Sequence, residues 1–203
     1  ILPLTPPDAH GSPYASPSAF AAWPGLLAHP GAAVSGVELA AFRERNLYWI
    51  DDWVRATGPE ALADQVRFDR EWSALRAHAA DRGIRIMGDI PFYVAPGAAD
   101  VVAHPGLFRT DLVAGVPPDE FTADGQLWGN PTYDWEAMAR DGQRWWIERL
   151  RRGAALHDSL RIDHFRAFEA WWGVPHGALT ASEGSWYPGP GAAVIEAARA
   201  RLG

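Results

Sequence analysis

An arginine and an aspartate stand two positions apart in the segment LRIDHF, at Arg161 and Asp163. Side chains two apart on a strand point to the same side, about 6 to 7 Å apart along the backbone, so their charged ends can meet. A guanidinium there favours the ionised carboxylate, which a carboxylate nucleophile or an electrostatic stabiliser requires. The alternative is a structural ion pair, which is weak evidence for function.

Asp89 has a similar place at the end of the apolar segment MGDI. In parallel α/β folds, catalytic groups lie where the strands end and the following loops begin. One strand-end aspartate more often caps a turn or pairs with a basic neighbour, but two beside aromatic loops favour a catalytic site. His164 points away from Asp163 unless the strand ends there, so by itself it is expected to pack or to cap.

Aromatic side chains indicate the kind of ligand. The chain has 11 tryptophans, and several rings lie in segments that read as loops: Tyr14, Trp128, Tyr133, Trp135 and Trp186. Flat rings beside Asn, Asp and Gln suit a sugar, which offers C–H faces for stacking and hydroxyls for hydrogen bonds. Tryptophans at helical spacing are expected to pack in the core: Trp72, Trp145 and Trp146.

The first element expected to position these residues is a helix that follows a capping box of Thr57 and Glu60. Its apolar face recurs at helical spacing: Phe68, Trp72, Leu75 and Ala79. Gly83 ends the helix, because glycine adopts the left-handed conformation easily. Residues 84–90 then predict a strand in which Ile84 and Ile86 alternate with Arg85 and Met87.

A second helix and strand follow the same order. Residues 141–157 place Ile147, Leu150 and Ala154 on one helical face and a charge ladder of Arg144, Glu148 and Arg152 on another. The segment SLRIDHF is the next predicted strand. Helix-then-strand order favours an α/β fold with a parallel sheet, either doubly wound or part of a (β/α)8 barrel. The long stretch 89–135 is expected to be a functional loop.

Composition excludes several classes of protein. A chain of 203 residues, 48% hydrophobic, can form a packed core. It has no cysteine, which favours a cytoplasmic location, and no apolar run long enough to cross a membrane. The net charge of −7 and scattered arginines make nucleic acid a poor partner. No metal or cofactor is expected. The start ILPLTPP and the end at a helix predict a fragment of a longer protein.

Five segments carry a resemblance to a known family: GSPYASPSAF, GIRIMGDIPFYV, VAGVPPDEF, GQLWGNPTYDW and LRIDHFRAFEAWW. In this order they resemble the motifs of the 4-α-glucanotransferases, or amylomaltases. The resemblance implies that residues 1–203 are a partial (β/α)8 TIM barrel with long aromatic-rich loops, forming one domain fragment. It also implies a retaining double displacement that transfers glycosyl units between α-1,4-glucans.

The resemblance implies roles for ten residues. Asp163 would be the nucleophile, and Arg161 would hold it charged and oriented. The substrate, a maltooligosaccharide, would meet Ser12, Tyr14, Asp89, Pro118, Asp119, Trp128, Asn130 and His164. Among these, Asp89, Tyr14 and His164 would hold the transferred glucosyl unit, Trp128 and Asn130 the neighbouring units, and Pro118 and Asp119 the acceptor.

A retaining enzyme also needs a general acid about 5 Å from the nucleophile. In the family this is a later glutamate, followed by a further aspartate, and both are expected beyond the end of this chain. Glu169 and Glu183 do not lie in the motif that carries the acid. Two alternatives stay open: a retaining α-glucan hydrolase of the same clan, and a fragment that binds maltooligosaccharide without catalysis.

Overall fold

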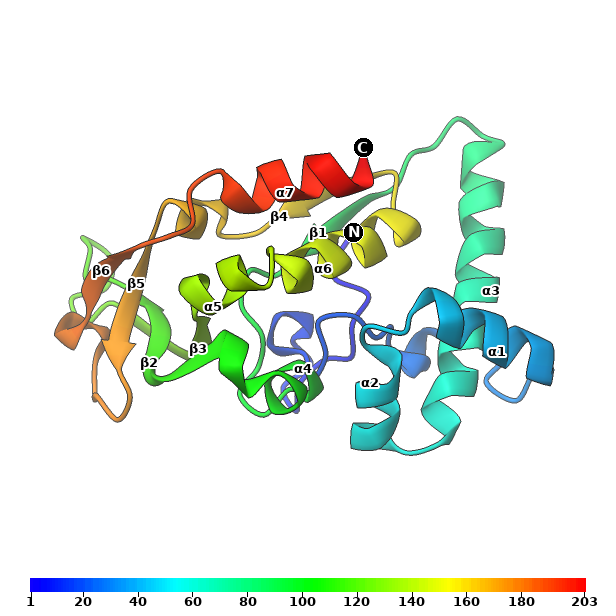
Figure 1. Cartoon of the computed structure of the whole chain (residues 1–203), viewed down its shortest axis with the longest axis horizontal. Coiled ribbons are helices and arrows are strands. Elements are labelled where there is room, and N and C mark those ends of the chain that lie inside the picture. The colour runs from blue at the N-terminus through cyan, green and yellow to red at the C-terminus, as the bar shows by residue number, and fades with distance from the viewer.

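The structure is a computed structural model that describes residues 1–203 (Figure 1). Its helices are α1 Gly36–Arg45, α2 Ile50–Thr57, α3 Glu60–Ala80, α4 Ala99–Ala103, α5 Trp135–Arg140, α6 Arg144–Leu156 and α7 Ala193–Leu202. Its strands are β1 Met87–Ile90, β2 Phe108–Val116, β3 Gln126–Tyr133, β4 Ser159–Ile162, β5 Ala170–Pro175 and β6 Ser185–Pro188. None of the helices is long and apolar enough to cross a membrane.

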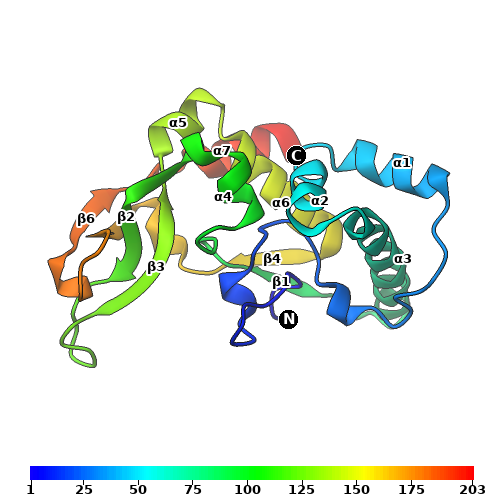
Figure 2. The ribbon, with the colours of Figure 1, turned by 90° about the horizontal axis from the view of Figure 1, so that it is seen from below.

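Strands β1 and β4 form a parallel two-stranded sheet, in the register that pairs Asp89 with Arg161. Figure 2 shows this sheet between the other strands on one side and helices α1 to α3 on the other. The predicted parallel pair is confirmed, and α6 packs against both strands. β1 is shorter than predicted: Ile84 and Ile86 lie before it, and Ile84 is exposed. The fold is mixed α/β, and these strands do not close a barrel.

The stretch 89–135, expected to be a loop, contains a β-hairpin. β2 and β3 join β5 and β6 in an antiparallel sheet of order β3-β2-β5-β6. The sequence pattern did not indicate these strands because they contain glycine and proline, and both residues usually weaken a strand. Gly115 lets β2 approach β3, because a Cβ there would lie 2.6 Å from the carbonyl oxygen of Gln126. Pro131 sits at an irregularity of the ladder, where the register shifts around Val113.

This sheet also corrects the expected loop positions of several aromatic residues. Trp128 and Tyr133 belong to β3, and Trp186 belongs to β6. Trp135 is the first residue of α5, and Tyr14 lies in a short 3₁₀ helix, Pro13–Ala15. Regular elements therefore hold the aromatic side chains that the sequence pattern predicts in loops.

Helix α6 crosses the centre of the core. Trp145 and Trp146 are fully buried, as predicted, and Ile147 and Leu150 are buried beside them. The predicted charge ladder is wrong. Arg152 is buried, with Nη2 2.9 Å from Asp69 Oδ1, while Glu148 pairs with Arg151. Ala154, expected on the apolar face, is exposed.

Helix α3 is confirmed, but its predicted capping box is wrong. Thr57 is the last residue of α2, where its hydroxyl donates to the carbonyl oxygen of Trp53, and Pro59 precedes α3. Phe68 in the first half of the helix is buried, whereas Leu75 in the second half is 50% exposed. The second half projects beyond the neighbouring elements, so its apolar face lies open (Figure 1). Gly83 takes the expected positive φ, 69°.

Candidate active site

Arg161 bridges the two strand-end aspartates. Its Nη1 donates to both carboxylate oxygens of Asp89, at 2.8 Å each, and its Nη2 donates to Oδ1 of Asp163 at 2.5 Å. The predicted contact between Arg161 and Asp163 is confirmed. The register of β1 and β4 adds Asp89 to the pair, because it sets Asp89 opposite Arg161. These bonds to Asp89 and Asp163 raise the pKa of Arg161, which stays a cation.

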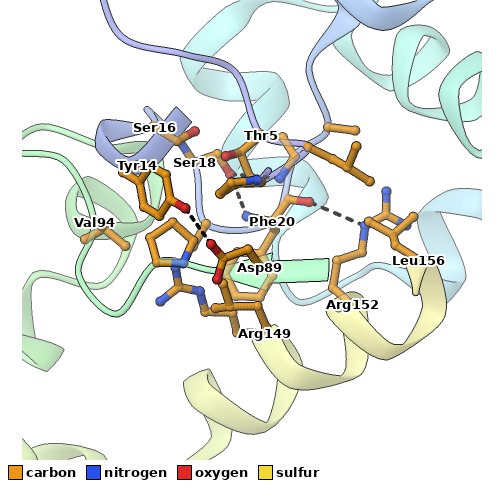
Figure 3. Close-up of a pocket in the computed structure, with 18 of the residues that line it drawn as sticks. Thr5, Tyr14, Ser16, Ser18, Phe20, Asp89, Val94, Arg149, Arg152 and Leu156 are labelled. Carbon is orange, nitrogen blue, oxygen red and sulfur yellow. Dashed lines mark hydrogen bonds between the residues drawn. The ribbon is translucent and has the colours of Figure 1, made fainter. Parts of the chain in front are cut away.

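Tyr14 reaches the same group from the amino-terminal segment. Its hydroxyl donates to Oδ2 of Asp89 at 2.5 Å (Figure 3). The Ser12 side chain accepts from the Tyr14 backbone N–H, and Asp8 accepts from the Ser12 N–H, so the turn is held on both sides. The bond to Asp89 raises the pKa of Tyr14, which therefore remains a hydrogen-bond donor. Asp89 thus accepts three side-chain hydrogen bonds.

A cavity of about 330 Å³ opens beside these groups. Its lining consists of Ser12, Tyr14, Ala15, Pro91, Phe92, Tyr93, Trp128, Asn130, Asp163 and His164. Six of the ten residues assigned by resemblance are therefore brought together. A smaller hollow of about 50 Å³, drawn in Figure 3, borders the Tyr14–Asp89 pair and extends to Arg149 and Arg152.

His164 faces the cavity because β4 ends at Ile162 and the chain turns. His164 has a positive φ of 49°. Its ring lies 5.0 Å from that of Trp128, nearly perpendicular, and its Nε2 is buried without a hydrogen-bond partner. Burial lowers the pKa of His164 below its usual 6.5, so the ring is neutral at pH 7. A neutral imidazole with an unused nitrogen can bond a ligand hydroxyl.

Strand β3 holds the second wall of the cavity. Asn130 donates from Nδ2 to the carbonyl oxygen of Val94 at 2.8 Å, which ties β3 to the segment after β1. Trp128 is 37% exposed, and its Nε1 donates to Oε1 of Gln126. The wall therefore combines an accessible indole with an amide that uses one of its two N–H donors within the protein.

Comparison with known proteins assigns the chain to a family. Residues 61–203 match the family described as 4-alpha-glucanotransferase. The chain belongs to this family. It is 48% identical over 158 residues to the 4-alpha-glucanotransferase of Streptococcus pneumoniae, covering 71% of this chain and 31% of the relative. It is 41% identical over 194 residues to that of Thermus thermophilus, covering 75% and 39%.

A solved amylomaltase has a similar fold. The amylomaltase from Streptococcus agalactiae in complex with acarbose matches with a TM-score of 0.86 and 28% identity, over 100% of this chain and 59% of that chain. The chain thus spans about a third of the Streptococcus pneumoniae relative and more than half of this solved amylomaltase.

Four residues assigned by resemblance to this family do not line the cavity. Asp89 and Arg161 lie beside it, bonded to Tyr14 and Asp163, whereas Pro118 and Asp119 make no contact with this group. Pro118 and Asp119 are exposed in the connection between β2 and β3. Asp119 Oδ1 accepts from the backbone N–H groups of Phe121 and Thr122 and from the Thr122 hydroxyl, and these bonds lower the pKa of Asp119. In this structure Asp119 shapes its own turn, and its contact with an acceptor stays a prediction.

Sequence reasoning missed two residues that line the cavity, Phe92 and Tyr93. Tyr93 is buried in its wall, with its ring 6.0 Å from His164. The carbonyl oxygen of Phe92 accepts from the Tyr133 hydroxyl and from Nη1 of Arg149, which fixes the segment after Asp89. The run PFY directly after Ile90, the last residue of β1, was the available signal. No cluster of three or more His, Asp or Glu side chains could hold a metal ion.

Proposed function

We propose that the chain carries the nucleophile of an enzyme that transfers glucan segments between α-1,4-glucans. The observation that carries this proposal is the single guanidinium of Arg161, which joins Asp89 and Asp163 at the edge of an aromatic cavity. The family and the solved amylomaltase in complex with acarbose support an α-glucan ligand. On this proposal β1 and β4 are neighbouring strands of a (β/α)8 barrel, and residues 1–203 are part of one catalytic domain.

Asp163 is suited to attack. Arg161 binds its Oδ1, and Oδ2 accepts no hydrogen bond from the protein, so one oxygen is free for the anomeric carbon. Attack forms a covalent glycosyl ester as the bond to the leaving glucan breaks. An acceptor hydroxyl then attacks the ester from the same face as the departed glucan, which restores the α configuration and frees Asp163.

The general acid must come from another residue. Asp163 is the one carboxyl among the residues that line the cavity. Asp89 accepts three hydrogen bonds from Arg161 and Tyr14, so it is held as a charged acceptor. Glu169 and Glu183 do not line the cavity. We therefore assign protonation of the leaving oxygen to a carboxyl outside residues 1–203.

The cavity wall supports transfer in preference to hydrolysis. Trp128 offers a half-exposed ring for a sugar face, and His164 offers an unused ring nitrogen for a hydroxyl. A bound sugar acceptor reacts faster than water because its hydroxyl is already positioned near the ester. Tyr14 and Asp89 would hold the glucosyl unit that is transferred.

The absence of cysteine supports the expected cytoplasmic location.

The test uses a polypeptide of the full length of the relatives that contains these 203 residues. Incubated with maltotriose, it should produce glucose and a ladder of longer maltooligosaccharides, read by chromatography. Asp163→Asn should abolish the ladder, whereas Asp81→Asn, at an exposed carboxylate after α3, should leave it unchanged.

Two other outcomes would favour the alternatives. Glucose and maltose without longer products would identify a hydrolase of the same clan. Binding of maltotriose without any change in its length would leave a carbohydrate-binding protein, and the proposed transfer would be wrong.

A further inference from the structure

A second groove lies between α5, the start of α6, β6 and the start of α7, elements that Figure 1 places together on one side of the molecule. It has a volume of about 570 Å³ and shares no residue with the cavity of Asp163. The proposed transfer reaction makes no use of this groove. Its lining includes Arg109, Asp134, Trp135, Gln143, Trp171 and Tyr187.

Gln143 is the unusual residue of this groove. It is 5% exposed, and its Oε1 is buried without a hydrogen-bond partner. Its backbone N–H donates to Met138 across the turn from α5 to α6, but its side-chain amide bonds to no protein group. A buried acceptor without a partner is destabilising and is rare in folded proteins. A ligand in the groove that donates a hydrogen bond would remove this cost.

Aromatic rings line the same groove as Gln143. Trp135 is half-buried, and its indole N–H makes no hydrogen bond with the protein. Tyr187 stacks on the buried ring of Trp171, at 4.8 Å between centroids, which holds it rigid. Asp134 uses Oδ1 to cap α5 at the Ala137 N–H and leaves its other oxygen free. Rings, an N–H donor and free oxygen acceptors together match the faces and hydroxyls of a sugar.

The charges of the groove disfavour an anionic ligand. Arg109 is bound by both its Nε and Nη2 to the carboxylate of Asp111. Asp134 and Glu136 add two carboxyl groups to the lining. A phosphate or carboxylate would meet a neutralised cation and two negative charges, whereas a neutral sugar would meet hydrogen-bond acceptors.

We propose that this groove is a second α-1,4-glucan site, which holds a distant part of a long glucan while another part occupies the cavity of Asp163. The identity of the ligand rests on the proposed function. Long glucans would reach both sites, and the second contact would raise their effective concentration at the first. Maltotriose is too short to gain from it.

The test uses the full-length protein carrying Asp163→Asn, so that the glucan is not consumed, in native gels that contain amylopectin. Gln143→Leu keeps the side-chain volume and removes the unpaired oxygen, so the fold should stay intact. Loss of one hydrogen bond should raise the dissociation constant for amylopectin about fivefold. Trp135→Ala should raise it at least as much, and Trp23→Ala, at an exposed tryptophan outside both cavities, should not.

The same variants with Asp163 intact separate this inference from the proposed function. Gln143→Leu should raise KM for amylose and leave transfer from maltotriose unchanged. Unchanged amylopectin binding in Gln143→Leu, with the melting temperature retained, would overturn the second site. An equal loss of transfer activity on maltotriose and on amylose in Gln143→Leu would also overturn the second site. A wild type that binds amylopectin through Gln143 but never elongates maltotriose would refute the transfer activity and leave this site standing.

Discussion

At the scale of single residues, the site depends on geometry that one guanidinium provides. Arg161 donates two bonds to Asp89 and one to Asp163 from different nitrogen atoms, so it sets the distance between the two carboxylates. Arg161 is itself 54% exposed, so the pairs contribute little to stability, and their value lies in orientation. A planar, forked donor is required for this arrangement.

Arg161→Lys should therefore damage chemistry more than binding. A lysine ammonium keeps the charge but cannot bond Asp89 at two oxygens and Asp163 at the same time. We expect kcat for maltotriose in the full-length protein to fall about 100-fold, with KM changed by less than about threefold. Arg140→Lys, at an exposed arginine of α5, is the control. A kcat within a factor of three of the wild type would show that charge alone suffices.

At the scale of elements, sequence periodicity predicted α3, α6 and the parallel strands β1 and β4, because each has an apolar pattern and a clear stop. The contact between Asp89 and Arg161 could not be predicted from the sequence, since it depends on the register of two strands 72 residues apart. The sheet of β2, β3, β5 and β6 was missed because glycine and proline interrupt its alternating pattern. In the structure, Gly115 allows β2 and β3 to approach closely, and Pro131 lies where the pairing of these strands is irregular.

A glycine also allows close packing where β1 meets the end of α6. A Cβ on Gly88 would lie 2.4 to 2.5 Å from ring atoms of His157, which is buried and bonded through Nδ1 to the carbonyl oxygen of Gly153. Gly88→Ala should therefore lower the free energy of unfolding by about 1–3 kcal/mol, as overpacking does. Urea unfolding measures this. Gly106→Ala, where a Cβ would meet nothing within 4 Å, is the matched control, and an equal loss in both variants would contradict the packing argument.

At the scale of the whole molecule, two buried charges connect distant parts of the chain. Asp100 in α4 accepts from the Ala19 N–H of the amino-terminal segment at 2.7 Å. Arg149 in α6 donates to Phe92 after β1, and its guanidinium lies over the rings of Trp145 and Trp146. These contacts join the amino-terminal segment, α4, the segment after β1 and α6 around one core. The core therefore includes groups whose protonation affects the whole fold.

Asp100→Asn should reveal this coupling as a pH dependence. Burial raises the pKa of Asp100 from its usual 3.8 to about 6, so the folded protein binds more protons than the unfolded chain between these values. Stability of the wild type consequently falls as the pH rises from 3.8 to about 6, by up to about 3 kcal/mol. Asparagine cannot ionise and can still accept from Ala19, so the variant lacks this loss. Its free energy of unfolding relative to the wild type should rise between pH 3.5 and 7 in urea titrations. A difference that stays constant over this range would show that folding does not raise the pKa of Asp100.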